Sequence, residues 1–210
     1  TGSRPSSVTS ILPNKAGKAW VYEGGIRVPL IIDAPILKQR GSTLNEPVVS
    51  TDFYPTLLDL AGLPLEPEQH LDGVSLKPLL DGEKKTLSRQ ALYFHYPHYH
   101  HINSMGPSGA LRMGDHKLVI RYEDSSTELY NLAKDRGETN NLASQNTGLV
   151  NRMKKMFDQW IEETGSLMPT ANLKYNGSKK NSSFYTPARD AHGIHAGSKP
   201  SDKDLPRVFL

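Results

Sequence analysis

The chain has 210 residues, enough for a hydrophobic core, and 36% of them are hydrophobic. Its 25 Lys and Arg against 22 Asp and Glu leave a net charge of +3 without a basic run, which argues against a nucleic-acid partner. No apolar run approaches the roughly 20 residues that cross a bilayer, and the lack of cysteine excludes disulfides and a cysteine nucleophile within these residues.

The first patterned segment joins a glycine-framed lysine to an apolar run. Lys18 follows Gly17, and a glycine pair at 24–25 marks a tight turn before residues 28–33 (VPLIID). Glycine lets the backbone approach a ligand closely, and a lysine ammonium suits an oxyanion. A solvated surface lysine is the alternative interpretation of Lys18. The continuous apolar run predicts a strand buried on both faces of a mostly parallel sheet.

Polar and aromatic side chains crowd both sides of the glycine pair. Tyr22 and Glu23 precede it, and Arg27 follows it closely. Glu23 and Arg27 can form an ion pair that braces the turn. We therefore interpret Tyr22, Glu23 and Arg27 as structural support of a site rather than as catalytic groups.

A helix is predicted over residues 51–62. Thr51 or Asp52 can cap its start, and Gly62 can end it. Its apolar positions share one face, which we expect to pack against a sheet; they are Phe53, Leu57, Leu58 and Ala61. A connection rich in proline and glycine follows, with one short apolar turn at 75–80.

Beyond residue 88 the pattern changes to short strands and one helix. Residues 91–96 and 128–132 have strand composition, and 109–122 predict a hairpin that turns at 114–115. Apolar residues recur at helical spacing between 146 and 164, which predicts an amphipathic helix packed on a small antiparallel sheet. From residue 172 the patterning ends, so we expect an extended or disordered tail over 172–210.

Residues 95–101 (HYPHYHH) are rich in histidine and tyrosine. Imidazoles bind zinc, but no carboxylate stands at a useful local spacing and Pro97 breaks the helix that a paired-histidine site needs. A surface loop without function is the second interpretation. We favour a recognition loop, because His and Tyr offer ring faces and hydrogen-bonding edges to a sugar or an anionic ligand. The candidate substrate-binding residues are His95, His98 and His100.

The order of motifs along the chain resembles one family. The segments that carry the resemblance are GKAWVYEGGIRVPLII at 17–32, DFYPTLLDLAGL at 52–63, LDGVSL at 71–76, GALRMGDHKL at 109–118, ELYNL at 128–132 and DRGETNNL at 135–142. Together they resemble the C-terminal half of a formylglycine-dependent sulfatase of the arylsulfatase type, in the alkaline-phosphatase-like superfamily.

The resemblance implies a chemistry for Lys18. It occupies the position of the family lysine that contacts the sulfate group, and is therefore the candidate catalytic residue. The family hydrolyses sulfate esters with a formylglycine made from Cys or Ser, and with a calcium ion held by Asp and Asn or Gln side chains. A sulfated saccharide or aryl sulfate is the implied substrate, and a periplasmic, secreted or lysosomal-type location is the implied compartment.

The chain also departs from the family pattern. It begins at Thr1 without a signal-like segment, and it contains neither a cysteine nor a Ser-x-Pro/Ala-x-Arg motif. We therefore expect the nucleophile, the calcium ligands and the N-terminal half of the domain to lie outside this chain. The isolated chain is expected to be inactive on sulfate esters and prone to aggregation through apolar surface that the N-terminal half would cover.

The expected fold class is α/β, in three parts. Residues 1–87 would be the C-terminal part of the catalytic domain with its mixed sheet, 88–171 a small α+β subdomain, and 172–210 the tail. Two alternatives to a sulfatase remain. One is a phosphate or phosphonate ester hydrolase of the same superfamily, and the other is a non-catalytic carbohydrate-binding module.

Overall fold

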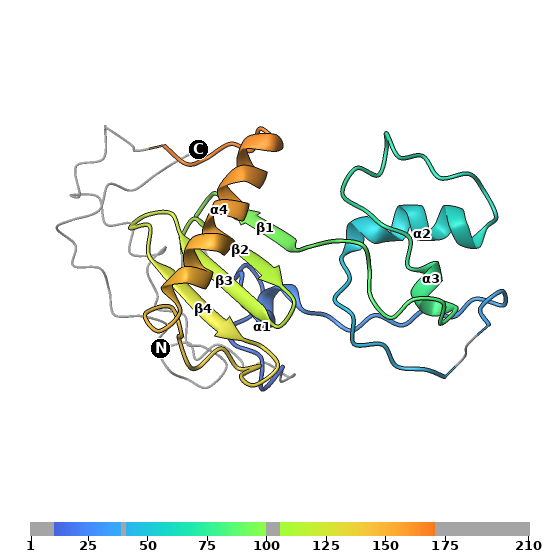
Figure 1. Cartoon of the computed structure of the whole chain (residues 1–210), viewed down its shortest axis with the longest axis horizontal. Helices are drawn as coiled ribbons and strands as arrows, with labels where there is room; N and C mark the ends of the chain where they lie inside the picture. Colours follow the sequence, from blue (N-terminus) through green and yellow to red (C-terminus); the bar gives the residue numbers. More distant parts are fainter. Residues whose placement is uncertain (1–10, 39–40, 100–105, 171–210) are drawn as a thin grey trace, which may run out of the picture. The chain divides into compact units, whose positions relative to one another are not determined.

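The computed structural model describes residues 11–38, 41–99 and 106–170, and it divides into two compact units (Figure 1). One unit is Pro29–Leu92, and the other joins the segment that ends at Val28 to the chain from Tyr93 onward. Residues 11–28 thus belong to the same compact unit as the C-terminal sheet. The predicted tail over 172–210 lies outside the described residues.

The larger unit is built on a four-stranded sheet in the order β1-β2-β3-β4. Its strands are β1 (Leu92–Tyr96), β2 (Ser108–Met113), β3 (His116–Arg121) and β4 (Thr127–Asn131). Strands β2 and β3 are antiparallel with Met113 opposite His116, so the loop has two residues. Gly114 in that loop has a φ of +56°, which glycine adopts without strain. The strands predicted over residues 91–96 and 128–132 and the hairpin predicted over 109–122 are confirmed.

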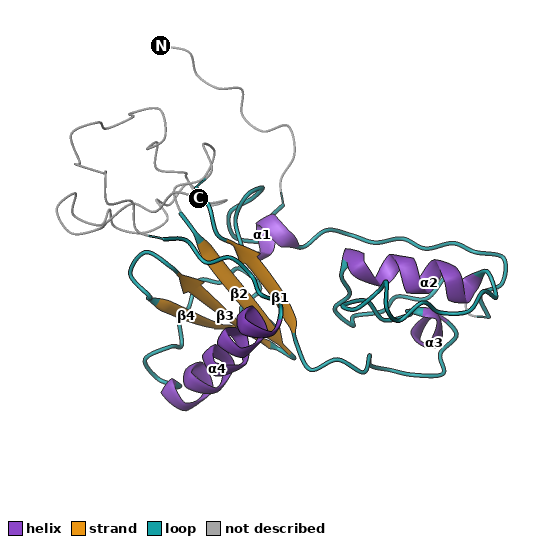
Figure 2. Cartoon of the chain, turned by 90° about the horizontal axis from the view of Figure 1, so that it is seen from above, coloured by secondary structure: helices purple, strands orange, loops and turns teal. Residues whose placement is uncertain are grey.

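Helix α4 (Thr147–Glu163) covers one face of this sheet (Figure 2). Its buried residues are Val150, Met153 and Phe157, which are among the positions that the helical spacing predicted. A side-chain Cβ at Gly109 on β2 would lie 2.4 Å from Phe157 Cζ, so only glycine allows the helix and the strand to approach this closely. The predicted amphipathic helix is confirmed.

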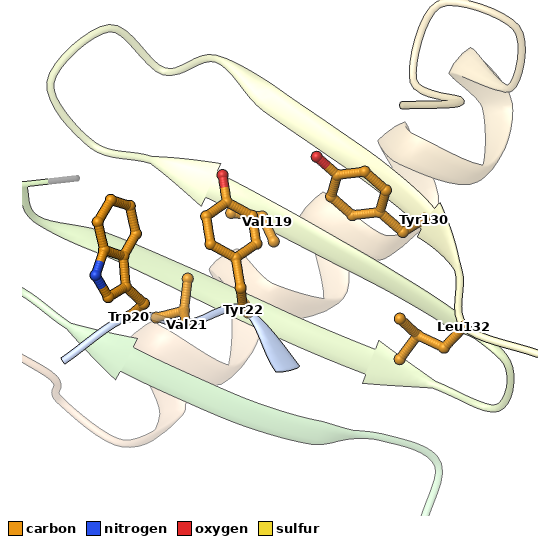
Figure 3. Close-up of a cluster of buried hydrophobic side chains, with 7 residues drawn as sticks. Trp20, Val21, Tyr22, Val119, Tyr130 and Leu132 are labelled. Carbon is orange, nitrogen blue, oxygen red and sulfur yellow. The ribbon is translucent and has the colours of Figure 1, made fainter. Parts of the chain in front are cut away.

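The opposite face of the sheet is covered by the segment before residue 28. Because strand residues alternate between faces, Ala110 points away from the side on which Gly109 meets α4. Trp20, Val21 and Tyr22 pack there against Ala110, Val119, Tyr130 and Leu132, as Figure 3 shows for the labelled members. Directly after them comes the one-turn helix α1 (Glu23–Ile26), at the position where the sequence predicted a glycine turn.

The smaller unit contains the 3-10 helix η1 (Ser50–Asp52), α2 (Phe53–Leu60) and α3 (Lys77–Leu80). The predicted helix is confirmed, and Gly62 ends it with a φ of +70°. Asp52, one of the two predicted capping residues, is the N-cap residue of α2, but its carboxylate does not bond the α2 backbone. It accepts the Val49 and Val74 amides and a 2.9 Å bond from Arg89 Nη1 instead.

Two other expectations about this region are corrected. Residues 28–33 form no strand, and Val28 and Ile31 are 79% and 91% exposed. A strand buried in a parallel sheet needs hydrogen-bonded neighbours, and the described part of the chain provides none for this segment. The predicted apolar face of α2 is also uncovered, since Phe53 and Leu57 are 42% and 64% exposed.

Candidate functional site

Lys18 lies exposed in a tight turn over residues 17–20. The Trp20 amide donates to the Gly17 carbonyl oxygen over 3.1 Å, which closes the turn. Ala19 stands at its third position with a φ of +73°, as type II turns require, and Ala16 just before it has a φ of +60°. Non-glycine residues in this region cost about 1 kcal/mol or more each and persist where surrounding contacts hold them. The turn that presents Lys18 is therefore held by its surroundings.

The glycine pair provides part of that support. A Cβ at Gly24 would lie 2.3 Å from the Lys15 carbonyl oxygen, and one at Gly25 would lie 2.0 Å from the Trp20 carbonyl oxygen. The Gly24 amide donates to the same Lys15 oxygen over 2.8 Å. Only glycine fits at either position, so α1 and the Lys18 turn pack backbone against backbone.

A buried ion network lies at the start of α1. Lys117 on β3 is fully buried, and its Nζ lies 3.1 Å from Glu23 Oε1 and 2.9 Å from Glu138 Oε1. Arg27 Nη1 lies 3.3 Å from Glu23 Oε2, which is the predicted ion pair, and Arg112 Nη1 lies 3.8 Å from the same oxygen. Arg27 is half exposed whereas Lys117 is enclosed, so Lys117 is the stronger partner of Glu23.

The two carboxylates of this network differ in their tendency to hold a proton. Burial alone would raise the pKa of Glu23, but the charge and hydrogen bond of Lys117 overcome it and hold the pKa below its usual value. Burial raises the pKa of Glu138 despite the same lysine. The lysine charge is thus balanced mainly by Glu23.

Tyr22 belongs to a second network beside the first. Its hydroxyl donates to Glu128 Oε2 over 2.7 Å, and the Tyr130 hydroxyl donates to the same oxygen over 2.6 Å. Lys15 Nζ lies 4.1 Å from the centre of the Tyr22 ring and donates to the Tyr130 hydroxyl over 3.2 Å. Burial, and after it the charge of Glu128, raises the pKa of both tyrosines, so they act as neutral donors. Tyr22 therefore anchors the loop to the sheet.

A family model described as N-sulphoglucosamine sulphohydrolase, C-terminal, matches residues 16–163. The chain belongs to this sulfatase family. The matched range includes the Lys18 turn, the glycine pair and Lys117 with both of its acidic partners, Glu23 and Glu138. The resemblance seen in the sequence is thereby confirmed.

Two curated relatives match most of this sulfatase chain. It is 39% identical over 167 residues to a protein named Sulfatase from Formosa agariphila, with 73% of this chain and 30% of that protein covered. It is 36% identical over 150 residues to N-acetylglucosamine-6-O-sulfatase from Bacteroides thetaiotaomicron, with 70% and 26% covered. The chain spans less than a third of the length of these relatives.

Solved structures agree on the fold. Ps i-CgsB in complex with k-i-k-neocarrahexaose is 29% identical, with a TM-score of 0.59 over 71% of this chain and 32% of that one. The phosphonate monoester hydrolase SpPMH from Silicibacter pomeroyi is 26% identical, with a TM-score of 0.56 over 75% and 34%. The sulfatase chain therefore has the α/β, alkaline-phosphatase-like fold that its motifs implied.

The structure describes two of the three candidate histidines, His95 and His98. His95 Nδ1 is 2.7 Å from the Tyr122 hydroxyl oxygen, and Nε2 is 3.0 Å from the Leu167 carbonyl oxygen. Both ring nitrogens thus have partners inside the subdomain. The exposed His98 lies against the Tyr96 ring with centroids 4.1 Å apart. His100 lies outside the described residues.

Sequence reasoning missed Lys117, Glu138, Lys15 and Glu128. No local pattern marks Lys117 as buried, because it follows His116 at the start of β3, before the apolar residues 118–120. Glu138 lies in the segment at 135–142 that carried the resemblance, but no local pattern pairs it with Glu23. Within the described ranges, no group of three or more acidic or histidine side chains could hold a metal. No helix there has the length and apolar character needed to span a membrane.

Proposed function

We propose that this chain supplies the sulfate-contacting lysine and the C-terminal subdomain of an enzyme that hydrolyses sulfate esters of carbohydrates. The observation that carries the proposal is the Lys18 turn, which holds an exposed cation on a strained, glycine-packed loop in a chain of the sulfatase family. A relative named for N-acetylglucosamine-6-O-sulfatase activity and a similar structure bound to neocarrahexaose support a sulfated saccharide as the substrate.

The chemistry assigned to Lys18 follows from its charge and its rigid backbone. Hydrolysis of a sulfate ester breaks the bond between sulfur and the ester oxygen, and negative charge is spread over the sulfate oxygens and the leaving oxygen. An ammonium held in advance beside those oxygens stabilises the transition state without reorganising. Lysine suits this task as a compact point charge with three donors.

Calcium and the formylglycine nucleophile are proposed to come from outside these residues. The described part of the chain has no side-chain cluster that fits a calcium ion, so no calcium ligand is assigned to it. Calcium would polarise the sulfate oxygens when bound. The residues described here hold Lys18 and shape the C-terminal subdomain.

The test is sulfatase activity of the full-length gene product with and without Lys18. Lys18→Ala should lower kcat for 4-nitrophenyl sulfate and for N-acetylglucosamine 6-sulfate about 100- to 1,000-fold, as loss of a preorganised donor does. Lys85→Ala removes another exposed lysine and serves as the matched control, with activity unchanged. The 210-residue chain alone should show no turnover. Full activity of Lys18→Ala, or turnover by the isolated chain, would overturn the proposal.

A phosphonate or phosphate ester hydrolase is the second candidate, because the chain shares its fold with a phosphonate monoester hydrolase. The two activities can be distinguished by comparing kcat/KM on one substrate of each kind. If kcat/KM for a phenylphosphonate monoester exceeds that for 4-nitrophenyl sulfate, the second candidate is correct. Saccharide binding that survives Lys18→Ala, without hydrolysis of either ester, would instead identify a carbohydrate-binding module.

A further inference from the structure

Residues 135–138, here called the clamp loop, are bonded to the segment that carries Lys18. Arg136 Nε donates to Asn14 Oδ1 over 2.9 Å, and the backbone carbonyl of Glu138 accepts a 3.2 Å bond from Lys15 Nζ. Glu138 Oε2 accepts the Glu23 amide over 2.7 Å. These contacts join segments between 115 and 123 residues apart in the sequence.

The clamp loop is itself held rigidly. The carboxylate of Asp135 accepts the backbone amides of Thr139 and Asn140, each over 2.8 Å, and the Glu138 amide donates to the Asp135 carbonyl over 3.2 Å. Glu138 has a φ of +52°, a conformation that a glutamate adopts only under constraint. A rigid loop of this kind can fix the position of what it binds.

Burial of the Glu138 carboxylate costs folding free energy. The side chain is fully buried, and its Oε1 has no hydrogen bond although Lys117 Nζ is 2.9 Å away. Lys117 lies between both acids, and Glu23 also faces Arg27 at 3.3 Å and Arg112 at 3.8 Å. Besides its ion pair with Lys117, the buried carboxylate of Glu138 holds the Glu23 amide, at the first residue of α1.

We propose that Glu138 is a positioning residue that acts through α1 to fix the Lys18 turn for its role at the sulfate group. Glu138 fixes the amide of Glu23, and Gly24 and Gly25 follow directly in contact with the backbone of residues 15–20. Because that contact leaves no room for a methyl group, a shift of α1 displaces the turn. This proposal rests on the proposed function of Lys18.

The experiment is a double-mutant cycle in the full-length gene product, using Glu138→Ala and Lys18→Ala. Glu138→Ala keeps the Lys117–Glu23 contact but releases the Glu23 amide. We expect kcat on 4-nitrophenyl sulfate to fall about tenfold or more, as small misplacements do, with KM nearly unchanged. In the Lys18→Ala background the same substitution should cause no further loss. Glu163→Ala removes an exposed glutamate on α4 and should leave kcat unchanged.

A purely structural role would give losses that add, so equal loss of kcat in both backgrounds overturns the proposal. Amide hydrogen exchange gives a readout independent of activity. Glu138→Ala should speed exchange at Trp20 and Gly24 while the β2–β3 amides stay protected, and unchanged exchange would also overturn it. If the parent enzyme is inactive on sulfate esters, the proposed function fails and the exchange arm alone decides whether Glu138 holds the turn.

If the Glu138→Ala variant does not fold, the Asn14→Ala variant takes its place in the experiment. Asn14→Ala removes only the bond from Arg136 on the same clamp loop. It should speed exchange in residues 15–24 and lower kcat in the same direction by a smaller factor. If Asn14→Ala changes neither quantity, the clamp loop does not position Lys18.

Discussion

The two units of this chain differ in how far they bury their apolar side chains. The sheet unit has a buried apolar core and a buried ion network, with Lys117 and Glu138 completely buried, although Val28 and Leu167 at its ends are 79% and 76% exposed. The unit Pro29–Leu92 instead exposes large apolar side chains, with Ile31 at 91% and Leu71 at 83%, around a small buried set that includes Leu76. The sheet unit therefore forms a core from its own residues, whereas the smaller unit has an apolar surface suited to another partner.

This comparison fits a chain that spans less than a third of its curated relatives. The sheet unit has a helix on one face and the Trp20–Tyr22 segment on the other, so both faces are covered within it. At the start of the smaller unit, residues 29–33 keep the composition of a buried strand without forming one. A segment of that kind gains stability only when neighbouring strands pair with it.

The largest effect should come from removing the buried cation of the sheet unit. Lys117→Met removes the buried cation between Glu23 and Glu138 and takes away the ion-pair partner of the buried Glu138 carboxylate, so it should destabilise this unit by about 3–5 kcal/mol. Hydrogen exchange should rise in β2–β4, while α2 in the other unit keeps its protection. Lys154→Met breaks only an exposed pair with Asp158 and is the matched control. Equal loss of protection in both units would show that they do not fold separately.

A smaller effect should appear in the pH dependence of stability. The raised pKa of Glu138 means that the folded state holds a proton more tightly than the unfolded state does. Its contribution is therefore present at acid pH and lost as the pH rises through the raised value. Glu138→Gln stays neutral, so its melting temperature relative to the parent should increase between pH 4 and pH 8.

The Glu23→Gln variant is a control for which the pH dependence of stability should have the opposite sign. The pKa of Glu23 is lowered, so its stabilisation is present at neutral pH and lost as the pH falls through the lowered value. The deficit of Glu23→Gln should therefore be greatest at neutral pH and shrink on acidification. If both variants differ from the parent by a constant amount across this range, the assignment of charge to the two carboxylates is wrong.

The smallest effect on stability should come from the exposed apolar residues of the smaller unit. Ile31→Ser and Leu71→Ser should change the free energy of unfolding by about 0.5 kcal/mol or less, because neither side chain is buried. They should nevertheless reduce aggregation and dye binding of the isolated chain, measured by light scattering and fluorescence. Leu76→Ala in the same unit is the contrast, with an expected loss of about 2–5 kcal/mol. If Ile31→Ser and Leu71→Ser leave aggregation unchanged, the exposed apolar residues of the smaller unit do not cause it.

Local patterns predicted most of the secondary structure. The hairpin at Gly114, the helix that ends at Gly62 and the amphipathic helix α4 were found because each depends on turn residues or periodicity within one segment. Helix α1 was missed because glycine disfavours helices, and here two glycines are required by a tertiary contact. The strand predicted at 28–33 failed because apolar composition cannot specify whether a pairing partner is present.

The sequence by itself determined the family, the α/β class and the candidate lysine, because motif order and hydrophobic period are properties of neighbouring residues. Only the tertiary structure decided what holds that lysine in place. Lys117 and Glu138 meet Glu23 across 94 and 115 residues of chain. The partner of a buried charge is set by how distant segments pack, which no local pattern records.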